Sequence, residues 1–493
     1  MEQVTLKPHT AIPGLPSESI MGWRGHVARM FQDPAWLRDM RQTYGDIVTL
    51  SDRHTNTNVF FPHADGGCYW VFGPENNRRL LSDPDTFHST TLIGNLYPIG
   101  PVSGRRAVLK RSGTGLFGVN GDEHRRHRRL VMPAFHRRRI VAYRDTMVAL
   151  TEEMLDRWQP GETVDISEEM MLLTMYIAGQ CLFGVDFRGE GKALGDLTQQ
   201  WMQGGSSALT HFFPIDLPPL PYNRFLTVSH RLDDAMRAIV EGKRAQGTDG
   251  DDVLSMLLHA TDAEDGSALT DDEVISHTMV FFAAGHETSS NALTWTLMLL
   301  ANHPQWARAV LDELDAVLGG AAPSAEQTGE LPVLEAVIKE SMRLLPPVPL
   351  SGRLAVAESE FEGYRLPAGA EFMFSHWVTH HDPAIYPDPE RFDPGRWEHI
   401  NPSAYEYMPF SAGRRQCIGA PFAMMEITII LAMLLQRYRL ALIEGTRIDP
   451  AITITMGPQD PLPVVVHPAD GHVEASAARV RGAIHGMVDF PQG

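Results

Sequence analysis

A proline-free stretch of about 30 residues, from Thr270 to Asn302, constrains the fold of this chain more than any other feature. Thr270 and Glu273 form a T-x-x-E capping box, in which each side chain caps the backbone N–H group of the other residue. Asp271 and Asp272 favour a helix N-terminus here, because carboxylates interact well with the positive end of the helix dipole. At about 1.5 Å per residue the predicted helix is on the order of 45 Å long, so it must cross the core of a large domain.

The middle of this helix contains residues that a buried segment normally excludes. Residues 283–290 are Ala-Ala-Gly-His-Glu-Thr-Ser-Ser. Polar residues that break the local pattern at a buried place are commonly functional. Glu287 and Thr288 are therefore candidate catalytic residues. The structural alternative for Thr288 is a hydrogen bond to the carbonyl of Ala284 that bends the helix, and both roles are compatible.

The rest of the chain favours a mostly α protein with minor β structure. Helical periodicity dominates between proline-rich connectors, and short β-like stretches occur near 47–50, 58–61, 69–72, 353–374 and 452–466. From its length alone, a chain of this size would be expected to contain about three domains. However, no repeat, low-complexity block or Gly/Ser linker divides the 493 residues. We therefore expect one domain over residues 1–493.

Composition argues against several classes of protein. The chain has 42 Lys and Arg against 61 Asp and Glu, a formal net charge of −19, so wholesale binding to nucleic acid is disfavoured. Three cysteines are too few for a disulfide framework and suit a reducing cytosol. The first forty residues contain no apolar stretch suited to an export signal or a membrane anchor. The apolar run 427–435 is too short to span a bilayer and is expected in a buried helix. These features predict a cytoplasmic protein.

Cys417 has surroundings that indicate chemistry. Residues 410–421 are Phe-Ser-Ala-Gly-Arg-Arg-Gln-Cys-Ile-Gly-Ala-Pro and lead into a predicted helix over 420–437. A thiolate at a helix N-terminus beside Arg414 and Arg415 is expected to have a lowered pKa. A nucleophilic cysteine would need a nearby base, and a single thiolate does not suit structural zinc. The surroundings suit the axial ligand of a haem iron.

The other two cysteines, Cys68 and Cys181, lack such surroundings and are predicted to be ordinary buried residues.

The motif Phe410-x-x-Gly413-x-Arg415-x-Cys417-x-Gly419 resembles the haem-binding signature of the cytochrome P-450 family of haem-thiolate monooxygenases. The resemblance covers roughly residues 10–467 and leaves 468–493 as a C-terminal tail. It implies the cytochrome P-450 fold, in which a long central helix lies over a buried haem beside small β sheets. Further motifs occur in the family's order: His124-x-x-x-Arg128 in place of W-x-x-x-R, Ala284-Gly285-x-Glu287-Thr288, Glu340-Ser341-Met342-Arg343 as E-x-x-R, and Asp393-Pro394-Gly395-Arg396-Trp397.

The resemblance implies haem b (iron protoporphyrin IX) as the cofactor, with Cys417 as the metal ligand. Phe410 would shield the thiolate, and Gly413 and Gly419 would let the backbone approach the sulfur and the porphyrin. The residues implied to hold the two propionates are His124, Arg128, Arg353 and Arg415.

The E-x-x-R pair, Glu340 and Arg343, is implied to form a buried network with Arg396 that supports the haem loop and takes no part in catalysis.

By the same resemblance, Glu287 and Thr288 deliver protons to dioxygen bound on the iron. One oxygen atom is then inserted into an apolar small molecule by hydroxylation or epoxidation. Lipid, terpenoid, steroid-like and polyketide substrates all suit such a site. Peroxide-driven oxygenation or peroxide rearrangement is a second hypothesis, and a non-catalytic haem-binding or sensor protein is a third. The Glu287/Thr288 pair disfavours both.

The pocket for this substrate is implied to be apolar and medium-sized. Its expected walls are segments 88–118, 203–226 and 348–351, the side chains of Phe281, Phe282 and Ala284, and the turn at Met456-Gly457.

The sequence has no flavin or iron–sulfur module, so electrons are expected from a ferredoxin or flavodoxin-type donor with its reductase. Eight arginines between 124 and 144 stand against the acidic trend of the chain, and we expect several of them to form a docking surface with Arg414 at its centre. The alternative is an ordinary solvated helix face. The eight are Arg125, Arg126, Arg128, Arg129, Arg137, Arg138, Arg139 and Arg144.

Overall fold

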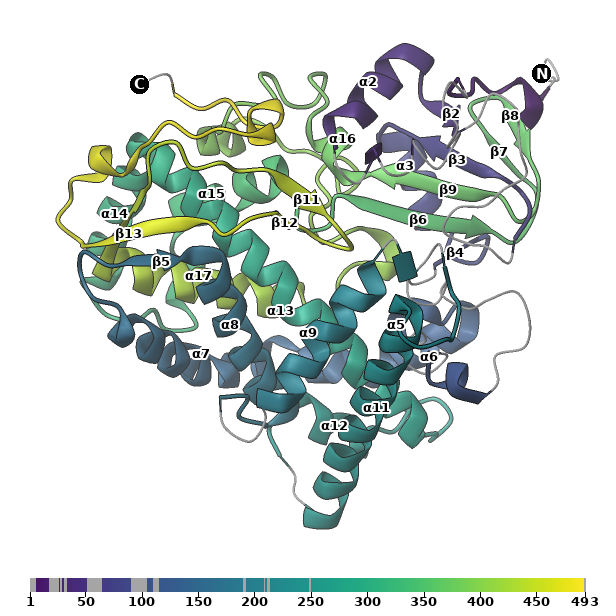
Figure 1. The fold of residues 1–493 in the computed structure, drawn as a ribbon, viewed down its shortest axis with the longest axis horizontal. Coiled ribbons are helices and arrows are strands. Elements are labelled where there is room, and N and C mark those ends of the chain that lie inside the picture. The colour runs from purple at the N-terminus through teal and green to yellow at the C-terminus, as the bar shows by residue number, and fades with distance from the viewer. Residues whose placement is uncertain are drawn as a thin grey trace.

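The helix predicted from the capping box is α13, Asp271–Asn302, and it passes through the middle of the molecule (Figure 1). Both halves of the capping box form: Thr270 accepts a hydrogen bond from the backbone of Glu273, and the Glu273 carboxylate accepts one from the backbone of Thr270. Most of the helix is buried. It packs most extensively against α8, Ile166–Ala178, and it also contacts other helices and strands β10, Tyr438–Leu442, and β12, Met456–Pro458.

The protein is described by a computed structural model in which residues 6–16, 26, 29–30, 33–50, 64–89, 104–109, 115–188, 192–207, 209–210, 213–247 and 250–491 are placed. The β-like stretch 58–61 lies outside the described residues. So do 90–103, 110–114, 208 and 211–212, which belong to the segments expected to line the pocket.

Helices make up most of the described fold, as predicted. Besides α8 and α13 they are α2 Ala35–Tyr44, α3 Pro74–Ser82, α5 Gly115–Gly118, α6 Gly121–Val131, α7 Arg137–Arg157, α9 Lys192–Ser206, α11 Pro221–Gln246, α12 Val253–His259, α14 Pro304–Leu318, α15 Pro332–Leu344, α16 His376–His380 and α17 Ala420–Arg437.

The small sheets lie toward the two ends of the chain. A five-stranded sheet has the order β2-β3-β9-β6-β4, and three-stranded sheets have the orders β1-β8-β7 and β10-β13-β5. A β11-β12 hairpin reaches α13. The strands are β1 Lys7–Pro8, β2 Ile47–Thr49, β3 Cys68–Val71, β4 Phe87–His88, β5 Thr163–Asp165, β6 Leu350–Ala355, β7 Ser359–Phe361, β8 Tyr364–Leu366, β9 Glu371–Ser375, β10 Tyr438–Leu442, β11 Pro450–Ile452, β12 Met456–Pro458 and β13 Pro463–Pro468.

The β-like stretches at 47–50, 69–72, 353–374 and 452–466 all contain strands. Strand β10 was not predicted. It follows α17 without a turn residue, and its five residues pair with β13. This long-range pairing leaves no local signal in the sequence.

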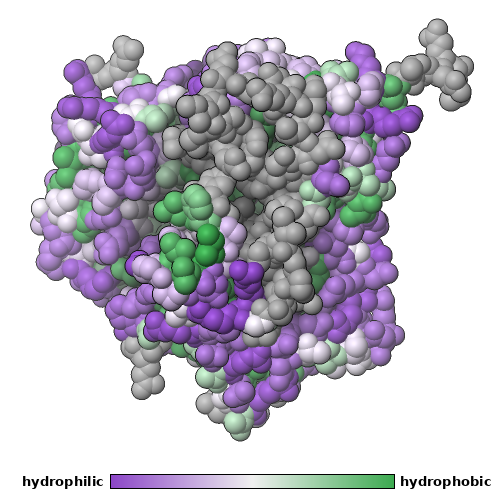
Figure 2. Space-filling view, turned by 45° about the vertical axis from the view of Figure 1, so that its right-hand side comes forward, coloured by the Kyte–Doolittle hydropathy of each residue, from purple (hydrophilic) through white to green (hydrophobic). Residues whose placement is uncertain are grey.

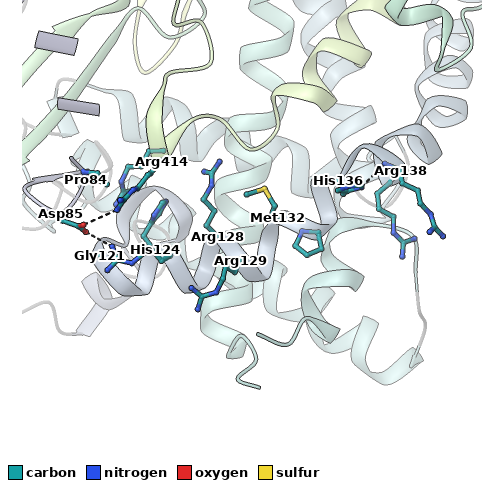
Figure 3. A pocket seen from close by; sticks show the side chains of 14 residues that line it. Pro84, Asp85, Gly121, His124, Arg128, Arg129, Met132, His136, Arg138 and Arg414 are labelled. Atoms are coloured by element: carbon teal, nitrogen blue, oxygen red, sulfur yellow. Dashed lines mark hydrogen bonds and ion pairs between the residues drawn. The ribbon is translucent and has the colours of Figure 1, made fainter. Parts of the chain in front are cut away.

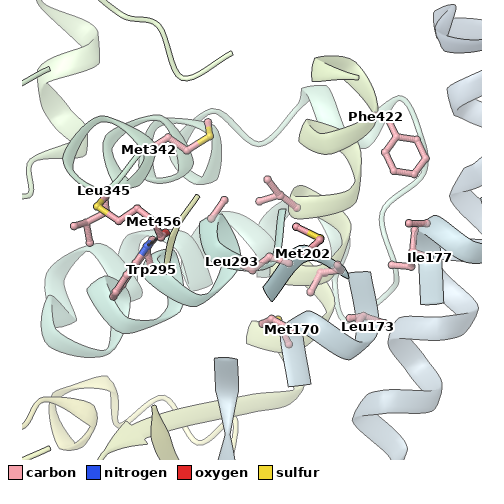
Figure 4. Packing of buried hydrophobic residues seen from close by; sticks show 14 of the residues in the cluster. Met170, Leu173, Ile177, Met202, Leu293, Trp295, Met342, Leu345, Phe422 and Met456 are labelled. Carbon is pink, nitrogen blue, oxygen red and sulfur yellow. Dashed lines mark hydrogen bonds between the residues drawn. The ribbon is translucent and has the colours of Figure 1, made fainter. Parts of the chain in front are cut away.

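The core is built from interlocking apolar side chains of α8, α13, α15 and α17 (Figure 4). Met170 and Leu173 of α8 lie near Leu293 of α13. Among the described residues, α17 is the one helix long and apolar enough to cross a bilayer by length and composition. Half of it is buried, and it packs against α7 and α13. The apolar run 427–435 thus lies in a core helix, as predicted.

Residues after β13 pack onto the body of the protein. Ile484 and Val488 are fully buried. The backbone N–H of Asp489 donates to the carbonyl of Glu390 over 2.9 Å. The C-terminal tail therefore covers the segment just before Arg396.

The predicted Glu340, Arg343 and Arg396 network is present and buried. Arg343 donates two hydrogen bonds to the Glu340 carboxylate, at 3.0 and 2.9 Å, and Arg396 donates one at 2.8 Å. Arg343 also donates to the carbonyls of His380 and Pro389, each over 2.8 Å. The two arginines thereby attach segment 387–396 to α15.

Replacing Arg343 with alanine should lower the free energy of unfolding by about 3–5 kcal/mol, because the Glu340 carboxylate is left buried without its main partner. Urea denaturation would measure the loss. Lys339→Ala is the matched control on the same helix, since it removes only the exposed Lys339–Glu335 pair, which is worth about 0.5 kcal/mol or less. Equal losses in the two variants would contradict the network's role.

Candidate active site

The loop before Cys417 is shaped by one glycine. Gly413 has a φ of +70°, and a Cβ built on it would lie 2.3 Å from the carbonyl oxygen of Leu81. The backbone N–H of Cys417 donates to the carbonyl of Phe410 over 2.9 Å, which closes the loop. Gly413 is therefore required by its φ and by close packing against α3, and its expected role in the approach of the backbone to a porphyrin stays a prediction.

Gly419 is the N-cap of α17 and differs from Gly413. A Cβ on Gly419 would lie 3.9 Å from the sulfur of Cys417, which is an ordinary contact. Its place beside the sulfur agrees with the prediction. Phe410 is partly buried and packs against the main core.

The thiol of Cys417 does not have the lowered pKa predicted from its sequence neighbours. Burial raises the pKa, and this effect exceeds the lowering by the backbone N–H groups of Gly419 and Ala420 and by the charge of Arg128. One side of Cys417 is nevertheless open, since the residue as a whole is exposed. Arg414 and Arg415 do not contribute, because Arg414 lies 3.4 Å from Asp85 and Arg415 donates to the carbonyl of Val119 over 2.6 Å.

The four residues predicted to hold propionates come together near Cys417. Burial and then the charge of Arg415 lower the pKa of Arg353 to about 9. Burial and Arg128 lower the pKa of Arg415 to about 10. Burial, Arg415 and Arg128 lower the pKa of His124 to about 4. Each of these side chains therefore lies within the electrostatic reach of another.

This cationic cluster lacks an internal counter-charge among the described residues. Arg415 is satisfied only in part: one nitrogen reaches Val119 and Asn120, and its buried Nε has no partner. Arg353 donates to the carbonyl of Gly352 and stacks over Phe374. Because buried charges are costly unless paired, this arrangement fits a ligand that carries carboxylates, as haem does.

The centre of α13 presents one open face. Ala283, Ala284, Glu287 and Thr288 are only partly buried, whereas the residues on either side along the helix are buried. Their spacing of one and four residues puts them on one side of the helix. The hydroxyl of Thr288 donates to the carbonyl of Ala284 over 2.7 Å, so the structural alternative considered for Thr288 is present.

Glu287 does not contact Thr288 through its side chain. Its Oε1 instead accepts a hydrogen bond of 2.6 Å from the hydroxyl of Thr455, 168 residues away. Burial raises the pKa of Glu287, and the bond from Thr455 opposes that shift. Thr455 is a residue that sequence reasoning missed. No local signal identifies it, because only the docking of the β11-β12 hairpin on α13 brings it there.

Two residues expected in the pocket wall pack in the core. Phe282 is fully buried and packs against Phe183 and Phe187. Phe281 packs edge-on against Phe135. Phe282 leaves α13 on a side other than its open face, so its assignment to the pocket was wrong. Phe281 lies three and seven residues before Ala284 and Thr288 on the helix, so its place in the pocket wall stays a prediction. Cys68 and Cys181 are buried, as predicted.

Exposed apolar side chains gather in segment 209–217, part of a region expected to line the pocket. They are Leu209, Phe213, Ile215 and Leu217, each more than half exposed. Figure 2 shows hydrophobic side chains in a patch on a largely hydrophilic face.

The arginines of 124–144 are divided between two helices, α6 and α7, because Pro133 lies in a short 3-10 segment, η4 Met132–Phe135, between them. A cleft of about 860 Å³ opens between α6, η4, the start of α7 and loop 413–415 (Figure 3). The lining residues include the arginines Arg125, Arg128, Arg129, Arg138, Arg139, Arg414 and Arg415 and the histidines His124 and His136, and the acid among them is Asp85.

Several of the eight arginines are committed to partners within the chain. Arg126 holds Glu273 at 3.0 Å and is mostly buried, so it does not belong to a free surface. Arg129 pairs with Asp262 at 2.8 Å, and Arg144 donates to the carbonyl of Pro323. Among the described residues, Arg138 is exposed and has no acidic partner.

Comparison with known proteins identifies related chains. A family profile described as "Cytochrome P450" matches residues 98–463. The chain is 32% identical over 453 residues to "Cyclooctat-9-en-7-ol 5-monooxygenase" of Streptomyces melanosporofaciens, covering 90% of this chain and 93% of that protein. It is 34% identical over 390 residues to "Cytokinin hydroxylase" of Arabidopsis thaliana, covering 75% and 76%. Among solved structures, retinoic acid-bound cyanobacterial CYP120A1 superposes with a TM-score of 0.78 at 25% identity, covering 94% and 100%.

Replacing Gly413 with alanine should cost the protein most of its bound haem, because the new Cβ would overlap the carbonyl of Leu81 and the φ of +70° disfavours a side chain. The haem-to-protein absorbance ratio of purified protein measures this loss. Gly486→Ala is the control, since nothing lies within 4 Å of its added Cβ. Full haem content in Gly413→Ala would show that the loop tolerates the shift.

Proposed function

Because the chain belongs to the cytochrome P450 family and is a haem-thiolate monooxygenase, we propose that it oxidises a terpenoid-like apolar substrate with haem b as cofactor. The observation that carries the cofactor assignment is the cationic cluster beside the open side of Cys417. The substrate class is supported by the Streptomyces relative, whose name specifies the oxidation of cyclooctat-9-en-7-ol. Apolar side chains exposed over 209–217 suit the approach of such a molecule.

In this proposal Cys417 binds the iron and the cationic cluster binds the propionates. The two carboxylates would stabilise the charged forms of Arg353 and Arg415 most, since burial lowers the pKa of both side chains. His124 and Arg128 complete the cluster from α6. Phe410 and Gly419 flank the sulfur. The haem supplies the binding and reductive activation of dioxygen.

The proposed catalytic residues are Glu287 and Thr288 on the open face of α13. The raised pKa of Glu287 keeps its proton available nearer to neutral pH than an exposed glutamate would. The Thr288 hydroxyl, which donates to Ala284, retains oxygen lone pairs that accept a proton donor. This pair supports dioxygen chemistry over the peroxide-driven alternative, which needs no proton delivery.

The enzyme needs a redox partner, and we propose that this partner is an acidic ferredoxin with its reductase. We also propose that the enzyme consists of one domain and works in the cytoplasm. The cationic cleft beside Cys417 supports this choice, because a basic surface steers an acidic partner. The proposed docking residues are Arg138, which has no acidic partner among the described residues, and Arg414, which is exposed beside Asp85. Arg126 is not part of the proposed docking surface, because it forms an ion pair with Glu273.

The Cys417→Ala variant should lack the CO-difference spectrum typical of thiolate-ligated haem. Reduced protein with CO, measured against the parent, checks this. Cys181→Ala should keep the parent spectrum, because that thiol is buried elsewhere in the core. A thiolate-type spectrum in Cys417→Ala would reject the assigned ligand and with it the proposed site.

Reversing Arg138 and Arg414 to glutamate together should slow reduction by ferredoxin about tenfold at low salt, because steering acts on the association rate. Stopped-flow reduction in the presence of CO measures the rate. The defect should shrink at high ionic strength, since charges are screened beyond about 10 Å at 0.1 M salt.

The control for this experiment is Arg157→Glu, an exposed arginine at the other end of α7. Reduction by dithionite should be unchanged in all variants. A defect that does not depend on salt would move the docking surface elsewhere.

A further inference from the structure

We propose that Thr455 is a positioning residue that holds the Glu287 carboxyl group against the β11-β12 turn and away from Thr288. The inference rests on the proposed role of Glu287 as proton donor. It adds a residue from outside α13 to the proposed machinery, and it links the acid to the β11-β12 turn.

Two hydrogen bonds form a chain from Asn291 through Thr455 to Glu287. The side-chain amide of Asn291 donates to the Thr455 oxygen over 3.2 Å, and the Thr455 hydroxyl donates to Glu287 over 2.6 Å. Thr455 and Asn291 are 4% and 6% exposed, so water does not compete freely for these bonds. The Thr455 hydroxyl therefore favours the charged form of the carboxyl group, and Asn291 holds the Thr455 oxygen in place.

The turn that carries Thr455 is anchored from three sides. The indole of Trp295 donates to the carbonyl of Met456 over 3.0 Å. The backbone N–H of Met456 donates to the carbonyl of Pro347 over 2.9 Å. A Cβ on Gly457 would lie 2.5 Å from the side-chain amide oxygen of Asn291, so the backbone of β12 packs directly against this side chain of α13. Thr455 is thus fixed relative to the helix that carries Glu287.

The positions of the two catalytic side chains explain why this anchoring matters. Thr288 bonds back to its own helix at Ala284, and Glu287 points across to the turn. A carboxyl group held by Thr455 must leave this bond to reach Thr288. Met456, which follows Thr455 directly and was expected in the pocket wall, is instead fully buried in the core, so the turn that supports Glu287 is itself held in place.

Few other groups act on the Glu287 carboxyl group. Its pKa is raised by burial and lowered by the bond from Thr455. The neighbouring His286 is buried and bonds to the carbonyl of Phe282. Glu426 of α17 is buried against Ser289, and burial raises its pKa to about 8. Removing the Thr455 hydroxyl should therefore leave burial dominant and raise the pKa of Glu287 further.

Three variants of the haem-loaded enzyme test the proposal. Thr455→Val removes the hydroxyl and keeps the shape, and Thr455→Ser restores a donor. Thr453→Val is the control in the same turn, where the exposed hydroxyl reaches only the carbonyl of Thr455 at 3.4 Å. The titration of the Glu287 carboxyl group is followed by infrared difference spectroscopy, with Glu287→Gln identifying its band. Peroxide released per NAD(P)H consumed is measured alongside.

The expected result is that Thr455→Val titrates at higher pH than the parent, and that Thr455→Ser and Thr453→Val titrate like the parent. The alkaline limb of coupled turnover should move upward with the infrared midpoint in Thr455→Val, and peroxide release should change severalfold. Each variant must keep the thiolate-type CO spectrum, which separates this test from a failure of the proposed function.

An unchanged infrared midpoint in Thr455→Val would overturn the proposal. So would an equal shift in Thr453→Val, because it would attribute the effect to the turn as a whole. The infrared titration needs no turnover, so it decides the question even if the true substrate differs from the proposed class.

Discussion

Glu340 accepts hydrogen bonds from Arg343 and Arg396 inside the core, and much of the C-terminal half depends on this arrangement. The carboxylate compensates both guanidinium groups, and their remaining donors are used by backbone carbonyls of 380–391. The irregular segment 381–391 is thereby attached to α15. The C-terminal tail, beyond the matched family region, closes over the same segment through Asp489.

A second group of buried charges is organised in the opposite way. Arg353, Arg415 and Arg128 are brought together beside the uncharged His124, with no carboxylate among the described residues to balance them. Burial and then the neighbouring arginine lower the pKa values of Arg353 and Arg415. Such a cluster is unfavourable for the protein alone and favourable once an anionic ligand joins it. Binding of the anionic propionates of a haem would relieve this unfavourable electrostatic free energy, and the relief would add to the affinity for the cofactor.

Helix α13 joins structural and chemical roles in one element. The segments on either side of its centre, 274–282 and 289–302, are buried, and the centre keeps one face open at Ala284, Glu287 and Thr288. The helix supplies the reacting groups, whereas the β11-β12 hairpin supplies the bond that orients Glu287. The proposed chemistry thus depends on contact between elements that are far apart in the chain.

The sequence by itself determined the local features of this protein. The capping box at Thr270, the polar centre of α13, the glycine-flanked Cys417 and the E-x-x-R pair are all written in short segments, because capping, periodicity and residue type act over a few positions. Tertiary structure alone decided how these features act on one another. Burial by the packed elements raises the pKa of Cys417, against the expected lowering. The packing of distant segments brings Arg126 to Glu273 and Thr455 to Glu287. Hydrogen bonds and electrostatic effects between distant segments depend on distances that only the folded chain defines.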